Sequence, residues 1–330
     1  MPADIFLAAN SPGITRAFRH DDHFHTESLL PDVDVRCFAA DPHHLGVILA
    51  GTQGDGLLRS EDSGKSWQPA GLLGKMIKSI AFSRSQPDIL YAGLKPPAVF
   101  KSTDGGVTWD ECESFQSIPS LPDWWSPAEP PGTAYVYGLT VHPDNPNIVL
   151  AGIEYGAVLR SEDGGASWTD HLHDAIEDCH TLMFHPTNGD YAYEGGGSGL
   201  GGAISTDAGK TWTQPSEGLD NRHYGWASTP DAADPLTWYV AVSPGPDVAH
   251  RDGTARAAIY RSRGGEAWVK LSGGLPDPIP NMPYALISDE PGHLYAGLRN
   301  GDIWFSTDYG DSWQQLPVNV GHLEYRLLML

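Results

Sequence analysis

Ser60-Glu-Asp62-Ser-Gly64-Lys-Ser66-Trp67 is the stretch of sequence that decides the fold, because it recurs along the chain. Complete copies of this octapeptide begin again at Ser102, Ser161, Ser205 and Ser306, and a degraded copy, one residue short and without the Asp, begins at Ser262. Successive copies start 42, 59, 44, 57 and 44 residues apart. Repeats of this length are typical of β-propeller blades, and the two wide spacings indicate long insertions.

A short apolar segment precedes each octapeptide, for example Val-Ile-Leu-Ala-Gly-Thr at 47–52. Its composition is that of a buried β-strand. Seven such segments occur, at 4–9, 47–52, 89–94, 148–153, 190–195, 237–242 and 293–298. The sequence therefore predicts an all-β fold, a seven-bladed β-propeller.

The two ends of the chain complete each other. Segment 323–330 matches the strand that opens the other blades, whereas residues 4–29 supply three strands and lack that first one. Pairing them closes the ring and removes two exposed sheet edges. We predict one domain, 1–330, with blades at 3–29 plus 321–330, 33–70, 75–112, 134–170, 178–215, 222–271 and 282–317.

The octapeptide has the chemistry of a tight turn between the third and fourth strands of a blade. Its Gly tolerates a positive φ, its Asp can accept backbone N–H groups, and its Trp can pack between blades. These residues resemble the Asp-box (bacterial neuraminidase repeat) superfamily, over nearly the whole chain. The superfamily includes sialidases, xyloglucan-cleaving glycosidases, sortilin-type receptors and the photosystem II assembly factor. The resemblance implies that the boxes are structural and lie opposite any active site.

The chain carries 42 Asp and Glu against 20 Lys and Arg, a formal net charge of −22. This balance argues against nucleic acid or an anionic membrane surface as a partner. Three widely spaced cysteines, Cys37, Cys112 and Cys179, predict no disulfide framework. Because the sequence shows no signal-like or membrane-spanning apolar run, we expect a cytoplasmic protein.

Aligning the innermost strands places one residue of each blade at the same level near the channel mouth. These residues are Arg36, Lys78, Tyr137, His180, Tyr224, Tyr284 and Tyr325. Two interpretations stay open: a ligand-binding ring, or tyrosines that close the channel and bind water.

Carboxylates are expected on the same face: Glu154 and Glu194 after the second strands of blades 3 and 4, Asp178 before His180, and Glu324 beside Tyr325. Hydrolysis of a glycosidic bond requires a carboxyl pair, one acting as acid and one as base or nucleophile. The sialidase variant uses a Tyr nucleophile assisted by Glu. The catalytic candidates are therefore Tyr224, His180, Glu154 and Glu194.

Three insertions, 113–134, 243–257 and 272–283, enlarge this face. Long loops on a rigid scaffold often carry recognition. Trp124 and Trp125 in the first insertion are equally compatible with a platform for sugar rings and with loop packing.

No cofactor is expected. A divalent metal is the alternative, with His171, His173, His180 and His223 as its ligands. Without a metal, His223 is a further ligand-binding candidate, because it can reach the same pocket as His180. His20-Asp-Asp-His23-Phe-His25 is interpreted as a solvated turn. The G-x-G-x-x-G at 197–202 is not a dinucleotide loop, because a strand rather than a helix follows it.

The sequence leaves two functions open. The first is an enzyme, a glycosidase-like hydrolase or lyase, acting on a small polar or carbohydrate-like ligand in the channel mouth. The second is a non-catalytic binding or assembly propeller for a protein partner. Seven blades, only two cations in the ring and no F/Y-R-I-P opening argue against a sialidase. An enzyme predicts a deep pocket with paired carboxylates, and a scaffold predicts a flat face.

Overall fold

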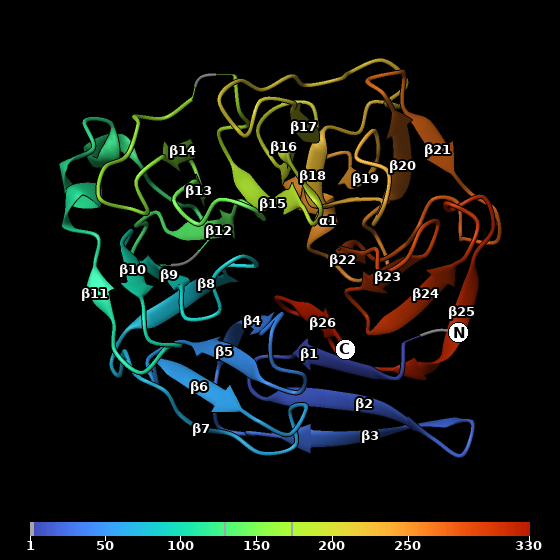
Figure 1. Ribbon diagram of the computed structural model, residues 1–330. Helices are drawn as coiled ribbons and strands as arrows, with labels where there is room; N and C mark the ends of the chain where they lie inside the picture. The colour runs from blue at the N-terminus through green and yellow to red at the C-terminus, as the bar shows by residue number, and fades with distance from the viewer. Residues whose placement is uncertain (1–2, 129, 173) are drawn as a thin grey trace.

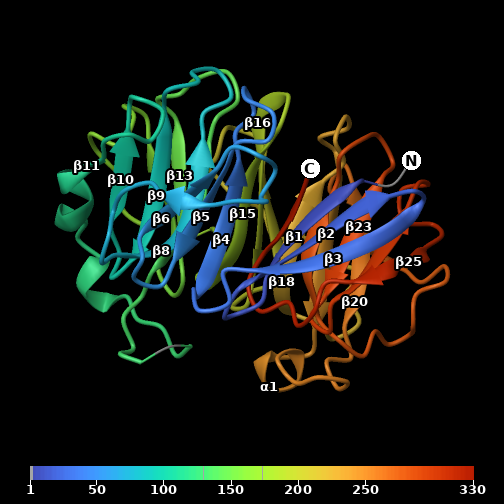
Figure 2. The same ribbon diagram turned by 90° about the horizontal axis from the view of Figure 1, so that it is seen from below.

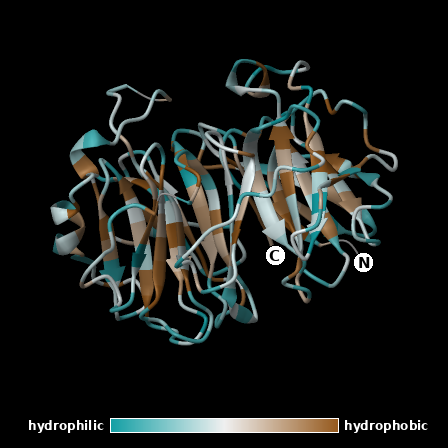
Figure 3. Cartoon of the chain, turned by 90° about the horizontal axis from the view of Figure 1, so that it is seen from above, coloured by the Kyte–Doolittle hydropathy of each residue, from teal (hydrophilic) through white to brown (hydrophobic). Residues whose placement is uncertain are grey.

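The computed structural model describes residues 3–128, 130–172 and 174–330, and shows seven small antiparallel sheets arranged around a central channel (Figure 1). The all-β fold and the seven blades predicted from the repeats are confirmed. Hydrophobic residues concentrate in the strands, and hydrophilic ones in the connections at both faces (Figure 3). Among the described residues, none of the helices has the length and hydrophobicity needed to cross a lipid bilayer.

The blades follow the chain in order. Blade 1 contains β4 (Val35–Ala40), β5 (Ile48–Thr52), β6 (Leu57–Ser60) and β7 (Gln68–Pro69). Blade 2 contains β8 (Met76–Phe82), β9 (Leu90–Lys95), β10 (Val99–Ser102) and β11 (Asp110–Glu111). Blade 3 contains β12 (Val136–Val141), β13 (Val149–Ile153) and β14 (Ala157–Ser161), and blade 4 contains β15 (Cys179–His185), β16 (Asn188–Gly196) and β17 (Gly202–Ser205).

The remaining blades have four strands each. Blade 5 contains β18 (Tyr224–Pro230), β19 (Thr237–Ser243), β20 (Ala258–Arg263) and β21 (Val269–Leu271). Blade 6 contains β22 (Pro283–Ile287), β23 (Leu294–Leu298), β24 (Asp302–Ser306) and β25 (Gln314–Asn319). Blade 7 contains β26 (Leu327–Met329), β1 (Ile5–Ala9), β2 (Ile14–His20) and β3 (His23–Leu29). Short helices η1 (Glu113–Ser117), η2 (Leu121–Asp123) and α1 (Pro246–Ala249) lie in the insertions.

The second strand of a blade lies in the middle of its sheet and is covered on both faces, so it reads as a continuous apolar run. All five residues of β13 are buried, for example. Its Gly152 is required by packing, because a Cβ there would lie 2.2 Å from Sγ of Cys179 in the next blade. The glycine of the apolar segment thus lets adjacent sheets approach each other closely.

Each complete Asp box is a self-contained hydrogen-bonded turn. In the first, Oδ1 of Asp62 accepts the N–H of Ser66 at 2.9 Å, and Oδ2 accepts its hydroxyl at 2.7 Å. The Gly64 N–H donates to Oγ of Ser60 at 2.9 Å. These hydrogen bonds to Ser66 lower the pKa of Asp62 to about 2. The carboxylates of the boxes therefore serve the turns themselves.

A second contact, which we call the inter-blade tie, links a blade to the next one. A cation on the third strand donates to the carbonyl of the fourth residue of the next blade's octapeptide. The ties are Arg16 to Ser63 (2.9 Å), Arg59 to Gly105 (3.4 Å), Lys101 to Gly164 (3.0 Å), Arg160 to Ala208 (2.9 Å) and Arg261 to Tyr309 (2.7 Å). The corresponding residues of blades 4 and 6 are Ile204 and Phe305, and these are the two blades whose next neighbour has no complete octapeptide.

The ring is closed by β26, which pairs with β1 in the register Phe6–Met329, Leu7–Leu328 and Ala8–Leu327. Closure by the C-terminal strand is confirmed, although the regular strand is shorter than the predicted 323–330. Before it, Arg326 and Glu324 still hydrogen-bond to Ala9 of β1, whereas the Leu323 N–H donates to the Arg299 carbonyl of blade 6 at 2.9 Å. Both termini consequently lie in the same blade.

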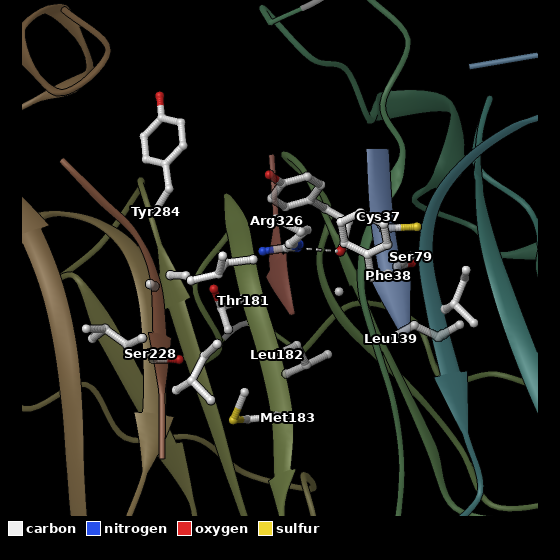
Figure 4. Close-up of a pocket in the computed structure, with 18 residues that line it drawn as sticks. Cys37, Phe38, Ser79, Leu139, Thr181, Leu182, Met183, Ser228, Tyr284 and Arg326 are labelled. Atoms are coloured by element: carbon white, nitrogen blue, oxygen red, sulfur yellow. Dashed lines mark hydrogen bonds between the residues drawn. The ribbon is translucent and has the colours of Figure 1, made fainter. Parts of the chain in front are cut away.

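Arg326 extends from the closing segment across the channel (Figure 4). Its Nη2 donates to the carbonyls of Tyr137 and His180, both at 3.2 Å. Its guanidinium also lies 4.4 Å from the centre of the Tyr137 ring. Arg326 thereby connects the closing segment to blades 3 and 4 and forms part of the wall of an inner cavity of about 250 Å³.

Candidate functional site

A cavity of about 590 Å³ opens at the mouth of the channel. Its lining includes Pro246 of α1 and Trp125 of the connection between β11 and β12, two segments that project from the same face of the ring (Figure 2). Blades 2 to 6 and the closing segment all contribute side chains to it. Its volume is that of a small-ligand pocket rather than of a flat scaffold face.

A β-bulge at the same level of each opening strand builds the wall of this pocket. The extra residues, which the strand register skips, are Arg36, Lys78, Tyr137, His180, Trp226 and Tyr284 in blades 1 to 6. A bulge re-aims the side chain of its extra residue, and bulges are common beside functional sites. In blade 5 the bulge falls at Trp226, whereas the repeat alignment assigns Tyr224 to this level; Tyr224 lies two residues nearer the mouth.

The structure brings most of the proposed ring into one place. The cavity is lined by Lys78, Tyr137, His180, Tyr224, Tyr284 and Tyr325. Arg36 lies behind this lining, where its guanidinium stacks 4.4 Å from the Tyr325 ring centre and pairs with Asp34 at 2.6 Å.

His180 and Asp178 form a buried ion pair in the cavity wall. Nδ1 of His180 lies 2.8 Å from the Gly225 carbonyl, which can only accept, so Nδ1 carries a proton. Nε2 lies 3.3 Å from Oδ1 of Asp178. Burial alone would lower the pKa of His180, but the Asp178 carboxylate outweighs it, and the pKa is raised. The imidazole is therefore stabilised in its charged form.

Glu154 is buried in the same wall. Burial raises the pKa of its carboxyl group, against the opposing effects of Tyr135 and His180. Oε1 accepts the hydroxyl of Ser126 at 2.8 Å. Asp178 and Glu154 thus give the cavity two carboxyl groups in different electrostatic environments.

Glu194 does not reach the cavity, contrary to the expectation that it follows its strand. β16 continues to Gly196, so Glu194 lies inside the strand and is completely buried. Its Oε2 accepts the N–H of Ile176 at 2.9 Å. Glu194 is a structural carboxyl group behind the pocket, and its proposed catalytic role is withdrawn.

A relay of three hydrogen-bonded side chains forms the wall contributed by blades 5 and 6. Nε2 of His250 lies 2.7 Å from the Tyr224 hydroxyl, and Nδ1 lies 2.6 Å from the Tyr284 hydroxyl. Burial, together with the charges of His180 and Arg299, lowers the pKa of His250 to about 4. His250 is therefore neutral at neutral pH, and the two histidines of the pocket have pKa values shifted in opposite directions.

Aromatic rings cover much of the remaining surface. Trp226 packs against His180 and Tyr284, with ring centres 4.3 and 4.8 Å apart. At the rim, Trp125 is 50% exposed and stacks on Tyr155 at 4.8 Å. Trp124 points away from this cavity and packs against Phe115, donating from Nε1 to Ser120 at 3.1 Å. Trp124 therefore packs its loop, whereas Trp125 lies at the rim of the cavity.

The proposed metal ligands are separated. His180 lines the main cavity, His171 lines a second cavity of about 280 Å³, and His223 is exposed. His173 lies outside the described residues. In the part of the chain that the structure describes, no group of three His, Cys, Asp or Glu side chains is arranged to hold a metal ion.

Several pocket residues were not named as candidates from the sequence, namely Trp226, Tyr135, Tyr155 and Arg299. Tyr135 and Tyr155 flank residues that the repeat alignment does single out. His250 belongs to the 243–257 insertion, which the sequence predicts on this face, but its position between Tyr224 and Tyr284 does not follow from the repeat.

The chain is a seven-bladed β-propeller of the Asp-box repeat type. No family model matches it. It is similar to the photosystem II assembly lipoprotein Ycf48 of Synechococcus sp. (strain CC9902), with 28% identity over 226 residues. The match covers 68% of this chain and 57% of the length of that relative.

Solved propellers show the same fold at low identity. An ancestral GH74 enzyme superimposes with a TM-score of 0.65 at 19% identity, over 85% of this chain and 38% of the enzyme. YCF48 from Cyanidioschyzon merolae gives 0.62 at 15% identity, over 89% of each chain. A structure of YCF48 bound to D1 peptide gives 0.57 at 18%, over 97% of this chain and 88% of that one. Both assembly factors and glycosidases thus share this architecture.

Proposed function

We propose that this chain is a non-catalytic binding propeller that receives a segment of a partner protein in the pocket at its channel mouth. The observation that carries the proposal is the 226-residue similarity to a protein named for assembly. A solved complex of a similar propeller with a peptide supports it. A pocket of about 590 Å³ is large enough for a few residues of an extended chain, with the surrounding loops contacting the rest.

The pocket is deep rather than flat, so the proposal requires that the partner segment inserts into it. Its titratable groups are engaged with one another: Asp178 with His180, and His250 with Tyr224 and Tyr284. Side chains held by such mutual contacts are preorganised, which lowers the entropic cost of binding. The exposed Trp125–Tyr155 stack at the rim offers an apolar surface of the kind that dominates binding energy in protein interfaces.

Calorimetric titration of the purified protein with the D1 peptide of the YCF48 complex, and with a scrambled version, tests this proposal directly. An array of 12-residue random peptides on the same protein extends the test to other sequences. We expect sequence-dependent binding that Trp125→Ala weakens about tenfold, as for other aromatic anchors. Absence of sequence-dependent binding in both formats overturns the proposal.

A second function, a hydrolase acting on a carbohydrate-like substrate, is favoured by one observation. Glu154 is a carboxyl group of raised pKa in the same cavity as Asp178, which is the combination that an acid and a second carboxylate require. Release of reducing ends from xyloglucan oligosaccharides, abolished by Glu154→Gln, would establish this function in place of the first.

A further inference from the structure

The Tyr224–His250–Tyr284 relay contains one more proton than its own hydrogen bonds use. Burial raises the pKa of both tyrosines well above the ordinary value, so each hydroxyl keeps its proton. A neutral imidazole has one N–H donor and one acceptor nitrogen. The three groups therefore hold three donor protons, and the two hydrogen bonds at 2.7 and 2.6 Å use two of them.

Which hydroxyl keeps the spare proton depends on the direction of the relay. Either Tyr284 donates to Nδ1 and Nε2–H donates to Tyr224, or both bonds run the opposite way. In the first case the hydroxyl proton of Tyr224 is not used within the relay and can be donated to another group. In the second case the same holds for the hydroxyl proton of Tyr284. Both tyrosines line the cavity, so either arrangement presents a donor to it.

The charges at the two ends select the first direction. The Arg299 guanidinium lies 5.9 Å from the centre of the Tyr284 ring and also interacts with its hydroxyl as a hydrogen-bond donor, so the lone pairs of that hydroxyl face Arg299. At the other end, the carboxyl groups of Asp178 and Glu154 oppose ionisation of Tyr224 and attract its hydroxyl proton. Both effects align the relay from Arg299 through Tyr284 and His250 to Tyr224.

We propose that the Tyr224 hydroxyl, held in place by His250, donates a hydrogen bond to a neutral carbonyl oxygen of the bound ligand. This inference rests on the proposed function, in which that oxygen belongs to the backbone of the partner segment. Within the described part of the chain, Tyr224 makes one hydrogen bond, to His250. A carbonyl is preferred to a carboxylate because Asp178 and Glu154 border the same position. His250 acts as a positioning residue, and Tyr224 makes the contact.

The tautomer of His250 tests the direction of the relay without any ligand. Nitrogen NMR of the full-length protein labelled at histidine, with His250→Gln to assign the signal, should show a neutral ring protonated at Nε2. A ring protonated at Nδ1 would overturn the inference, because the Tyr224 hydroxyl would then donate its hydrogen bond to Nε2 of His250.

Two small probes separate the possible acceptors. N,N-dimethylacetamide offers only a carbonyl oxygen, and acetate offers a carboxylate of similar size. We expect the first to perturb the His250 ring signals in a saturable way, and Tyr224→Phe to abolish the effect. Perturbation by acetate alone would contradict the preference for a neutral acceptor.

Binding of the D1 peptide completes the test. Tyr224→Phe should weaken it about 3- to 10-fold, the range for one lost hydrogen bond, and Tyr239→Phe, a buried tyrosine outside the cavity, is the matched control. In the His250→Ala background, Tyr224→Phe should add little, because the two residues act as one unit. If the wild type and Tyr224→Phe bind the D1 peptide with equal affinity, the inference about Tyr224 is overturned and the proposed function is not. If the protein does not bind the peptide but N,N-dimethylacetamide still perturbs the His250 ring signals, only the proposed function is overturned.

Discussion

The carboxyl group of Glu194 is fully buried, and burial is the main reason that its pKa is raised to about 8. The folded protein therefore keeps a proton that the unfolded chain releases above its ordinary value of 4.5. Because the folded state binds more protons, this contribution to the free energy of unfolding is complete below pH 4.5 and is lost as pH rises towards about 8. A difference of one bound proton changes the free energy of unfolding by at most about 1.4 kcal/mol per pH unit.

In Glu194→Gln the side chain does not titrate, so the folded state no longer binds this additional proton. We expect the variant to lose less stability than the wild type between about pH 5 and about pH 8 in urea unfolding experiments. Glu113→Gln, at an exposed glutamate in η1, is the control and should follow the wild type. Parallel pH profiles for Glu194→Gln and the wild type would show that the carboxyl group is not held protonated.

At the scale of the elements, the inter-blade ties account for the placement of cations on the third strands. The Arg160 side chain is 5% exposed and bonds a carbonyl of the next blade, whereas the Arg59 side chain is 30% exposed and its tie is longer, at 3.4 Å. Leaving a buried carbonyl without its donor costs about 1–3 kcal/mol. Arg160→Met should therefore reduce the free energy of unfolding by that amount, and Arg59→Met by clearly less, in urea titrations. A larger loss of stability in Arg59→Met than in Arg160→Met would contradict the structural role assigned to the ties.

The sequence allowed the elements to be predicted well and the site only partly. The octapeptides and apolar segments repeat, so blade number, blade order and ring closure follow from them, whereas the absence of a regular fourth strand from blades 3 and 4 does not. The level of the pocket also follows, because the bulge recurs at one position of each opening strand. Glu194 was misplaced because β16 runs longer than the other second strands. The 243–257 insertion placed His250 on the correct face, but its contacts with Tyr224 and Tyr284 could not be predicted, because that insertion occurs once and has no repeat to align with.

For the whole molecule, closure by β26 removes an open edge from both ends of the chain. Deleting residues 327–330 should lower the melting temperature and expose β1, which promotes self-association through strand pairing. Thermal unfolding and size-exclusion chromatography measure the two effects. Adding a synthetic peptide of residues 321–330 should reverse both. An unchanged melting temperature in the truncated chain would show that the closing strand contributes little.

The ties alone group the blades into two arcs, although other hydrogen bonds, such as that of the Thr181 hydroxyl to the Trp226 carbonyl at 2.7 Å, also join blades 4 and 5. The ties run without a break from blade 7 through blades 1, 2 and 3 to blade 4, and separately from blade 5 to blade 6. Under mildly denaturing conditions, we expect hydrogen exchange to release residues 222–319 as one unit; uniform exchange around the ring would contradict this. Glu154 and His180 belong to the long arc, and the relay of His250 belongs to the short one. A ligand in the pocket would therefore contact both arcs at once. Binding should slow the opening of the ring at the two blade interfaces that lack a tie, between blades 4 and 5 and between blades 6 and 7.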